Sequence, residues 1–183
     1  MIEQTLLAGV HIVTPKRFSD DRGFFSETWN RRALVDAGID IDFVQDNHSL
    51  SRQAGTLRGL HFQTPPHAQA KLVRVVRGAV FDVAVDYRVG SPTYLQWVGV
   101  ELTAENGKQL LVPEGFLHGF LTLADDTEVL YKCSDYYAPD CDRSVLFDDP
   151  DIGIDWGADI TVLSDKDANA SLVANTPSPF TYG

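Results

Sequence analysis

The chain is poor in basic residues and in sulfur. Its 183 residues include 15 lysines and arginines against 26 aspartates and glutamates, which gives a formal net charge of -11. A surface this acidic argues against general affinity for nucleic acid or for anionic membranes. There are only two cysteines, Cys133 and Cys141, and we expect both to be free thiols in a reducing cytoplasm.

Long apolar runs are also missing. No segment approaches the roughly 20 apolar residues that span a bilayer, and residues 1–9 lack the basic start and apolar stretch of a signal peptide. We therefore expect a cytoplasmic protein with neither a membrane nor a nucleic acid as partner. A chain of this length can bury one full core and shows no internal repeat, so we expect a single domain over residues 1–183.

The sequence consists largely of short alternating runs separated by turn residues. Apolar side chains recur at every second position in residues 80–87, 96–102 and 127–133. Turn signals such as Glu105-Asn-Gly107 and Asp125-Asp126 separate these runs. Many short strands at this spacing are typical of a β-sandwich or a closed barrel.

Helices and chain ends complete the expected layout. Asn30 can cap one helix that Gly38 ends, and a second short helix is expected to begin at Ser164. Residues from about 4 to 14 are predicted to form an edge strand at a dimer interface, because an exposed apolar edge invites pairing with another chain. Residues from about 150 onward are expected to form a C-terminal extension.

A two-part motif lies in the middle of the chain. Gly55-Thr-Leu-Arg-Gly-Leu-His61-Phe-Gln63 precedes Gly107-Lys-Gln-Leu-Leu-Val-Pro113-Glu-Gly115-Phe-Leu-His118. The spacing resembles the two motifs of the cupin barrels, G-x5-H-x-H and G-x5-P-x-G-x2-H. That resemblance implies a mainly β fold, a cupin-type jelly-roll β-barrel with a few short peripheral helices.

Gln63 stands where cupins carry a second metal-binding histidine. His61, Gln63, His67 and His118 could in principle be assembled around a metal, but two imidazoles and an amide make a poor divalent site. Lys71 lies near the place where cupins supply a carboxylate, and a cation there would repel a metal. We therefore expect no metal and no other cofactor, with a metal-dependent cupin enzyme as an alternative.

Six longer strings widen the resemblance to about residues 5–170. In this order they are similar to the dTDP-4-dehydrorhamnose 3,5-epimerase family. The strings are 20–27, 43–49, 57–63, 71–78, 113–120 and 130–137. The resemblance implies a homodimer that converts dTDP-4-dehydro-6-deoxy-D-glucose to dTDP-4-dehydro-L-rhamnose, for dTDP-L-rhamnose biosynthesis. The C4 ketone acidifies the protons on C3 and C5, so a base on one face of the sugar and a proton donor on the other can invert both centres without a redox cofactor.

By the same resemblance, His61 is the base, Tyr131 the proton donor, and Lys71 the cation near the C4 oxygen, where it would stabilise an enolate. Asp167 matches the acid that orients the histidine. Two observations keep that assignment open. Ser164-x-x-Asp167 also resembles a capping box, and Asp82, a carboxylate within an apolar strand, is the other candidate partner of His61.

The resemblance also implies a set of substrate-binding residues. They are Arg22, Glu27, Gln45, Asn47, Arg58, Lys71, His118, Tyr137 and Asp142. Among them, Tyr137 is expected to stack on the thymine, and the arginines suit the diphosphate. Asp142 stands where the family commonly carries a glutamate, which predicts a weaker or displaced polar contact. Arg58 and His61 have opposite strand parity, so a shared pocket requires a local irregularity, which we place at Gly59.

Three further alternatives remain at this point. The chain could epimerise only C3 or only C5, or it could be a keto-isomerase of another dTDP-deoxysugar pathway. It could also be a barrel that binds sugar nucleotides without catalysis. The pairing of His61 with Tyr131 argues against the last, because binding alone does not require a base and a phenol on opposite faces.

Overall fold

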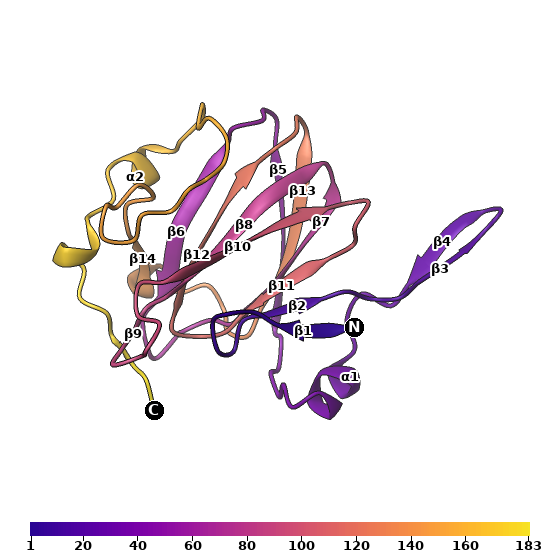
Figure 1. The fold of residues 1–183 in the computed structure, drawn as a ribbon, viewed down its shortest axis with the longest axis horizontal. Helices are drawn as coiled ribbons and strands as arrows, with labels where there is room; N and C mark the ends of the chain where they lie inside the picture. Colours follow the sequence, from indigo (N-terminus) through magenta and orange to yellow (C-terminus); the bar gives the residue numbers. More distant parts are fainter.

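Two antiparallel β-sheets face each other in the computed structural model, which describes all 183 residues (Figure 1). The strand order is β1-β2-β11-β7-β13-β5 in the six-stranded sheet and β10-β8-β12-β6-β14 in the five-stranded sheet. The strands of the six-stranded sheet are β1 (Ile2–Gln4), β2 (His11–Val13), β5 (Gln45–Ser51), β7 (Lys71–Arg77), β11 (Gln109–Val112) and β13 (Thr127–Cys133). Those of the five-stranded sheet are β6 (Leu57–Gln63), β8 (Ala79–Asp86), β10 (Trp97–Thr103), β12 (Phe116–Thr122) and β14 (Asp142–Ser144).

Smaller elements surround the two sheets. The two-stranded pairs are β3 (Arg17–Asp20) with β4 (Gly23–Ser26), and β9 (Arg88–Val89) with β15 (Phe180–Thr181). The helices are α1 (Arg31–Asp36), α2 (Asp165–Ala168) and the single 3-10 turns η1 (Pro139–Cys141) and η2 (Val173–Asn175). The expected mainly β fold with short helices is confirmed, as are both predicted helix caps, because Asn30 and Ser164 accept hydrogen bonds from Ala33 and Asp167. No helix is both long and apolar enough to cross a membrane.

The main core lies between the two sheets. Strand alternation divides β8 between two environments. Val80 and Ala84 belong to the inner cluster, together with Val73 of β7 and Val129 of β13. The interior therefore also receives the polar side chains that share this parity, including Asp82, which is fully buried.

The C-terminal residues cover the outer face of the five-stranded sheet. Leu60, Val83 and Leu117 on that face pack with Trp156 and Val173 in a second buried cluster. Figure 1 shows this segment, coloured orange to yellow, beside β6 and β14, with α2 next to β6. This packing places α2 within reach of the residues on β6.

β6 contains the irregularity that the sequence predicted at Gly59. His118 of β12 pairs with His61, but Phe120 pairs with Arg58, so Gly59 and Leu60 of β6 lie opposite the single residue Gly119 of β12. Gly59 has a φ of 135°, and a Cβ atom there would lie 2.5 Å from the Cα of Gly119. Only glycine fits this bulge, which turns both Arg58 and His61 toward the interior.

The prediction of one strand over residues 4–14 is wrong. β1 and β2 are separate strands that pair with each other, and β2 also pairs with β11. Between them the chain turns, with Thr5 Oγ1 donating to Val10 O at 3.0 Å and Gly9 at a φ of 95°. Leu7 and Val10 are buried in the inner core, so the chain itself buries much of this apolar run. Of this segment, only β1 forms an edge of the six-stranded sheet.

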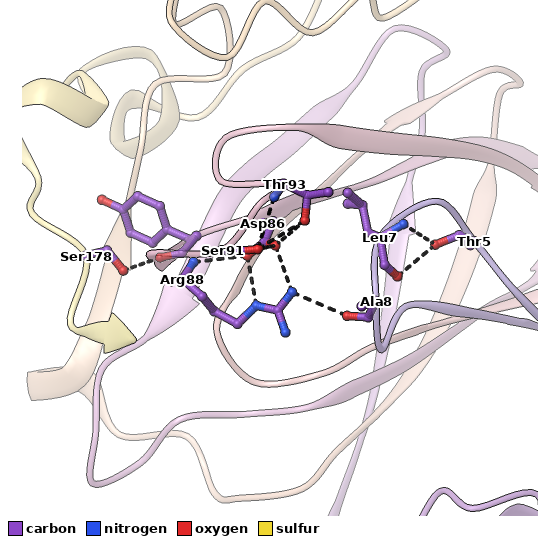
Figure 2. A network of polar contacts seen from close by, with 9 residues as sticks. Thr5, Leu7, Ala8, Asp86, Arg88, Ser91, Thr93 and Ser178 are labelled. Carbon is purple, nitrogen blue, oxygen red and sulfur yellow. Dashed lines mark hydrogen bonds and ion pairs between the residues drawn. The ribbon is translucent and has the colours of Figure 1, made fainter. Parts of the chain in front are cut away.

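A buried polar network ties this N-terminal turn to the barrel, as Figure 2 shows. Asp86 at the end of β8 accepts hydrogen bonds from Arg88 Nε at 2.8 Å and from the hydroxyls of Ser91 and Thr93, each at 2.6 Å. Arg88 Nη2 also donates to Ala8 O at 3.3 Å. Burial alone would raise the pKa of Asp86, but these hydrogen bonds outweigh it and lower the pKa to about 2.

We expect Asp86→Asn to lower the free energy of unfolding by roughly 2 kcal/mol at neutral pH. The depressed pKa means that the charged carboxylate stabilises the folded state, and the amide lacks that charge. That contribution is present above the unfolded pKa, near 4, and is lost as the pH falls toward the folded value of about 2. Urea unfolding at several pH values measures it. A gap between wild type and variant that stayed constant from pH 5 to pH 2 would contradict the assignment.

Candidate active site

Two adjoining cavities, of about 410 and 420 Å³, open between the sheets. We call them the first and the second cavity. Four residues line both: His61, Lys71, Tyr131 and Lys166. The remaining polar residues that line the first cavity are Ser49, Thr56, Arg58, His118, Ser164 and Asp167. Those of the second are Gln45, Asn47, Gln63, Gln69, Tyr137 and Asp142.

His61 is held by Asp167. The His61 Nε2 atom lies 2.6 Å from Asp167 Oδ1, and the carboxylate is 2% exposed. The other carboxylate oxygen accepts the Gly59 backbone N–H at 3.4 Å, while the Asp167 backbone N–H donates to Ser164 Oγ at 3.1 Å. Asp167 therefore fills both roles that the sequence left open, since its backbone serves the helix cap and its carboxylate meets His61.

The charge on Asp167 is stabilised where it sits. Burial alone would raise the pKa of this carboxyl, but the hydrogen bond and charge of His61, with smaller help from Ser164 and Gly59, lower it below its usual value. With Nε2 engaged by this carboxylate, His61 has Nδ1 free of any hydrogen bond within the protein. A histidine held in this way presents one basic nitrogen in a fixed direction.

Asp82, the alternative partner, contacts a different histidine. Its Oδ1 lies 2.8 Å from His118 Nε2, and both side chains are buried. His118 is directly opposite His61 in the β12–β6 pairing, so two histidine–carboxylate pairs lie side by side at the first cavity.

Tyr131 and Lys71 complete the wall shared by both cavities. Both are half-buried, on β13 and β7, and Tyr131 shares its strand parity with Val129 and packs against the inner core. Burial raises the pKa of Tyr131, so the phenol keeps its proton at neutral pH. Burial lowers the pKa of Lys71, with nearby Cys133 and Asp142 opposing the shift, and its ammonium has no hydrogen-bond partner in the protein.

Two predicted residues lie outside both cavities. Arg22 is at the tip of the β3–β4 hairpin, which projects away from the sheets (Figure 1). Its side chain is 90% exposed and contacts Asp20 at 2.5 Å. Glu27 follows the hairpin and accepts a hydrogen bond from Asn30 at 2.9 Å. One chain alone therefore does not bring Arg22 and Glu27 to the site.

His61 and His118 are neighbours, but no group of three or more histidine, cysteine, aspartate or glutamate side chains is placed to hold a metal ion. The Gln63 amide donates to His67 O at 2.6 Å and accepts from the Ala138 N–H at 2.8 Å, so it holds two loops. His67 pairs with Asp135 and lines neither cavity. The Nε2 atoms of His61 and His118 are also engaged, the first by Asp167 and the second by Asp82.

Lys166 is the one charged lining residue that the sequence did not single out. It precedes Asp167 on α2 and forms an ion pair with Asp142 of β14. In the sequence it belongs to Ser164-Asp-Lys-Asp167, a run that indicates only a helix start. The one signal in the sequence that could have identified Lys166 was its neighbour Asp167. In a helix of one turn, a residue next to a site residue lies near the same cavity.

Comparison with known proteins identifies the chemistry. The family model described as dTDP-4-dehydrorhamnose 3,5-epimerase matches residues 4–175. The chain belongs to this family. It is 52% identical over 181 residues to the dTDP-4-dehydrorhamnose 3,5-epimerase of Sinorhizobium fredii, covering 96% of this chain and 91% of that one.

Solved structures of this epimerase family confirm the cupin jelly-roll fold. The dTDP-6-deoxy-D-glucose-3,5-epimerase of Legionella pneumophila, in complex with dTDP-4-keto-L-rhamnose, superimposes with a TM-score of 0.95 at 44% identity, covering 100% of this chain and 99% of that one. A 3'-monoepimerase from Streptomyces bikiniensis, in complex with dTDP-quinovose, gives 0.89 at 39% identity, covering 95% and 88%. The chain is thus an isomerase of dTDP-linked sugars, and its family requires no metal.

Lys71→Met tests the unpaired ammonium. Loss of the charge is expected to reduce epimerisation by about 10²–10³-fold, because a developing enolate oxygen would lose its cation. The same change is expected to raise the melting temperature near pH 7, since burial disfavours the ammonium. The stability gap should narrow as the pH rises toward 10.5, the ordinary lysine pKa. A variant that lost activity and stability together would indicate a structural role.

Proposed function

We propose that this 3,5-epimerase works with His61 as the base and Tyr131 as the proton donor. The enzyme converts dTDP-4-dehydro-6-deoxy-D-glucose to dTDP-4-dehydro-L-rhamnose, in dTDP-L-rhamnose biosynthesis. The observation that carries the assignment is the shared cavity wall, where an oriented imidazole and a protonated phenol both border the space open to a sugar. The proposal places them on opposite faces of the ring.

Proton transfer in this arrangement needs no cofactor. His61 Nδ1 takes a proton from C3 or C5, and the electron pair of the broken C–H bond moves into an enolate on the C4 oxygen. Lys71 supplies positive charge to that oxygen. Tyr131 then donates its proton to the opposite face, which inverts the centre and leaves a phenolate beside the imidazolium of His61. The imidazolium releases its proton to solvent and the phenolate takes one from solvent before the other centre reacts. Asp167 holds the imidazolium in place and balances its charge.

The second cavity suits the nucleotide. Gln45 accepts the Tyr137 backbone N–H at 3.0 Å and donates to Asn47 Oδ1 at 3.0 Å, so the three form one connected wall. The Tyr137 ring is exposed, which leaves a face on which thymine can stack. Arg58 and His118 line the first cavity, where we assign them to the diphosphate and the sugar. Asp142 borders the second cavity beside Lys166.

A homodimer would explain why Arg22 and Glu27 lie outside both cavities of their own chain. Phe18, Phe24 and Phe25 of the projecting hairpin are all exposed, which is unfavourable for an isolated chain. A second copy that covers this hairpin would bring Arg22 and Glu27 to the nucleotide of its partner. Sedimentation equilibrium that gave a monomer at micromolar concentration would contradict the dimer.

The cytoplasm is the proposed location, in keeping with the two free cysteines, Cys133 and Cys141. Epimerisation at one centre alone remains the second candidate function, because the monoepimerase of known structure is also similar. Its identity of 39% is below the 52% of the Sinorhizobium fredii 3,5-epimerase.

Incubation with dTDP-4-dehydro-6-deoxy-D-glucose in deuterated water tests the function. The wild-type enzyme is expected to place deuterium at both C3 and C5, detected by NMR and mass spectrometry. Tyr131→Phe should retain part of the exchange but lose most of the inversion, because His61 can return a proton to the face from which it came. Deuterium at one carbon in the wild type would indicate a single-centre epimerase. Equal losses of exchange and inversion in the variant would contradict the donor role of Tyr131.

A further inference from the structure

The segment that carries Tyr137 has no regular secondary structure. Residues 134–138 lie between the end of β13 at Cys133 and the start of η1 at Pro139. The side chain of Tyr137 is 58% exposed, so packing does little to fix its ring. In such a segment, the position of the ring depends on the contacts that hold the backbone.

Three glutamine side chains, from β5, β6 and the loop before β7, hold this backbone at four successive residues. The hydrogen bonds are Gln69 Nε2 to Asp135 O at 2.7 Å, Gln63 Nε2 to Tyr136 O at 3.2 Å, the Tyr137 N–H to Gln45 Oε1 at 3.0 Å, and the Ala138 N–H to Gln63 Oε1 at 2.8 Å. No backbone group of residues 135–137 pairs with another backbone group. The glutamines therefore take the place of a strand or helix ladder.

Gln63 makes the two contacts that flank Tyr137. It is the last residue of β6, two positions after His61, and only 5% of it is exposed. Its other amide hydrogen donates to His67 O at 2.6 Å. Both N–H groups of the amide are thus engaged by the protein, and Gln63 has no donor left for a ligand. Its contacts tie the segment of Tyr137 to the strand that carries His61.

A ring that is fixed before binding gives a higher affinity than a ring that the ligand must order. Ordering one flexible side chain on binding lowers the affinity by about 3- to 10-fold. Without the Gln63 amide, Tyr136 O and the Ala138 N–H would lose their partners in the chain and pair with water instead. The ring of Tyr137 would then sample more positions in the free enzyme.

We propose that Gln63 is a positioning residue for nucleotide recognition, which holds the peptide groups on both sides of Tyr137 and so aims its ring at the base. Gln63 itself makes no contact with the substrate. This inference rests on the proposed function, because it takes Tyr137 as the residue that stacks on thymine. It also gives a role to the amide at the position where cupins carry a metal-binding histidine.

Calorimetric titration with thymidine and with dTDP tests this role. Gln63→Met has nearly the same shape but neither donor nor acceptor, and it is expected to weaken both ligands by the same factor, about 3- to 10-fold. Tyr137→Ala is expected to weaken both by about 5- to 100-fold, the effect of losing one stacked base. In the double variant, the change at Gln63 should have no further effect, because no ring remains to be positioned.

Gln69→Met is a second, milder variant. Gln69 is half-buried, and its amide makes a single contact with the segment, at Asp135 O. We expect it to weaken thymidine and dTDP by about two- to threefold, and this loss should also vanish in the Tyr137→Ala background. The variant keeps the test decisive if Gln63→Met does not fold.

Steady-state kinetics separate positioning from a general structural fault. Gln63→Met is expected to raise KM and leave kcat within about twofold of wild type, because the groups that transfer protons stay in place. Thr127→Val is the matched stability control. It removes a buried hydrogen bond, from Thr127 Oγ1 to Ala124 O at 2.8 Å, at the other end of β13, and Thr127 lines neither cavity. Its melting temperature should fall while its KM and its affinity for dTDP stay at the wild-type values.

Several outcomes would overturn the inference. A loss in Gln63→Met that persisted in full in the Tyr137→Ala background would make Gln63 a direct ligand. Unchanged thymidine affinity in Gln63→Met would show that the ring does not depend on it. An equal loss in Thr127→Val would reduce the effect to stability. Wild-type affinity in Tyr137→Ala would contradict the stacking on which the inference rests, and a wild-type enzyme that did not bind dTDP would contradict the proposed function itself.

Discussion

The active site depends on one backbone constraint, the close approach of Gly59 and Gly119 where β6 bulges against β12. No side chain fits between these strands at Gly59, and the extra residue reverses the parity of β6 at that point. Arg58 and His61 consequently both face the cavity, while Leu57 and Leu60 both face the outer core. The Gly59 N–H also donates to the Asp167 carboxylate at 3.4 Å, so the bulge takes part in holding this carboxylate beside His61.

Packing in the outer core positions one side of the active site. Trp156 and Val173 pack on the outer face of the five-stranded sheet, and the segment between them includes α2. Apolar burial thus supplies the free energy that places Asp167 beside His61. The charge of Lys71 opposes stability instead, since its ammonium is half-buried without a hydrogen-bond partner. Such a feature is expected where a charge is kept for a developing oxyanion.

Much of this was predictable from the sequence, and the failures have physical reasons. Alternation in residues 80–87, 96–102 and 127–133 predicted strands that the structure contains, and the opposite parity of Arg58 and His61 located the bulge at Gly59. The N-terminal residues were predicted as one strand because their apolar run was assigned to an interface, whereas Leu7 and Val10 are buried in the core. A capping motif could not decide the role of Asp167, because the cap uses its backbone and His61 its side chain.

The residues that sequence reasoning placed least well depend on contacts between distant segments or on the proposed contacts between chains. Arg22 and Glu27 belong to a recognisable motif, yet Arg22 is on a hairpin that leaves the barrel and Glu27 follows that hairpin. Lys166 resembles an ordinary surface lysine until β14 and α2 are seen to meet. Long-range packing of this kind has no local signal in the periodicity of the chain.

The central claim is that Asp167 makes His61 an effective base, and hydrogen exchange by Asp167→Asn tests it most directly. The account predicts that solvent deuterium enters C3 and C5 about 10²–10⁴-fold more slowly than in the wild type, with the affinity for dTDP unchanged. Asp165→Asn, on the same helical turn but exposed to solvent, is the matched control and should exchange at the wild-type rate. Exchange by Asp167→Asn within tenfold of the wild-type rate would contradict the account.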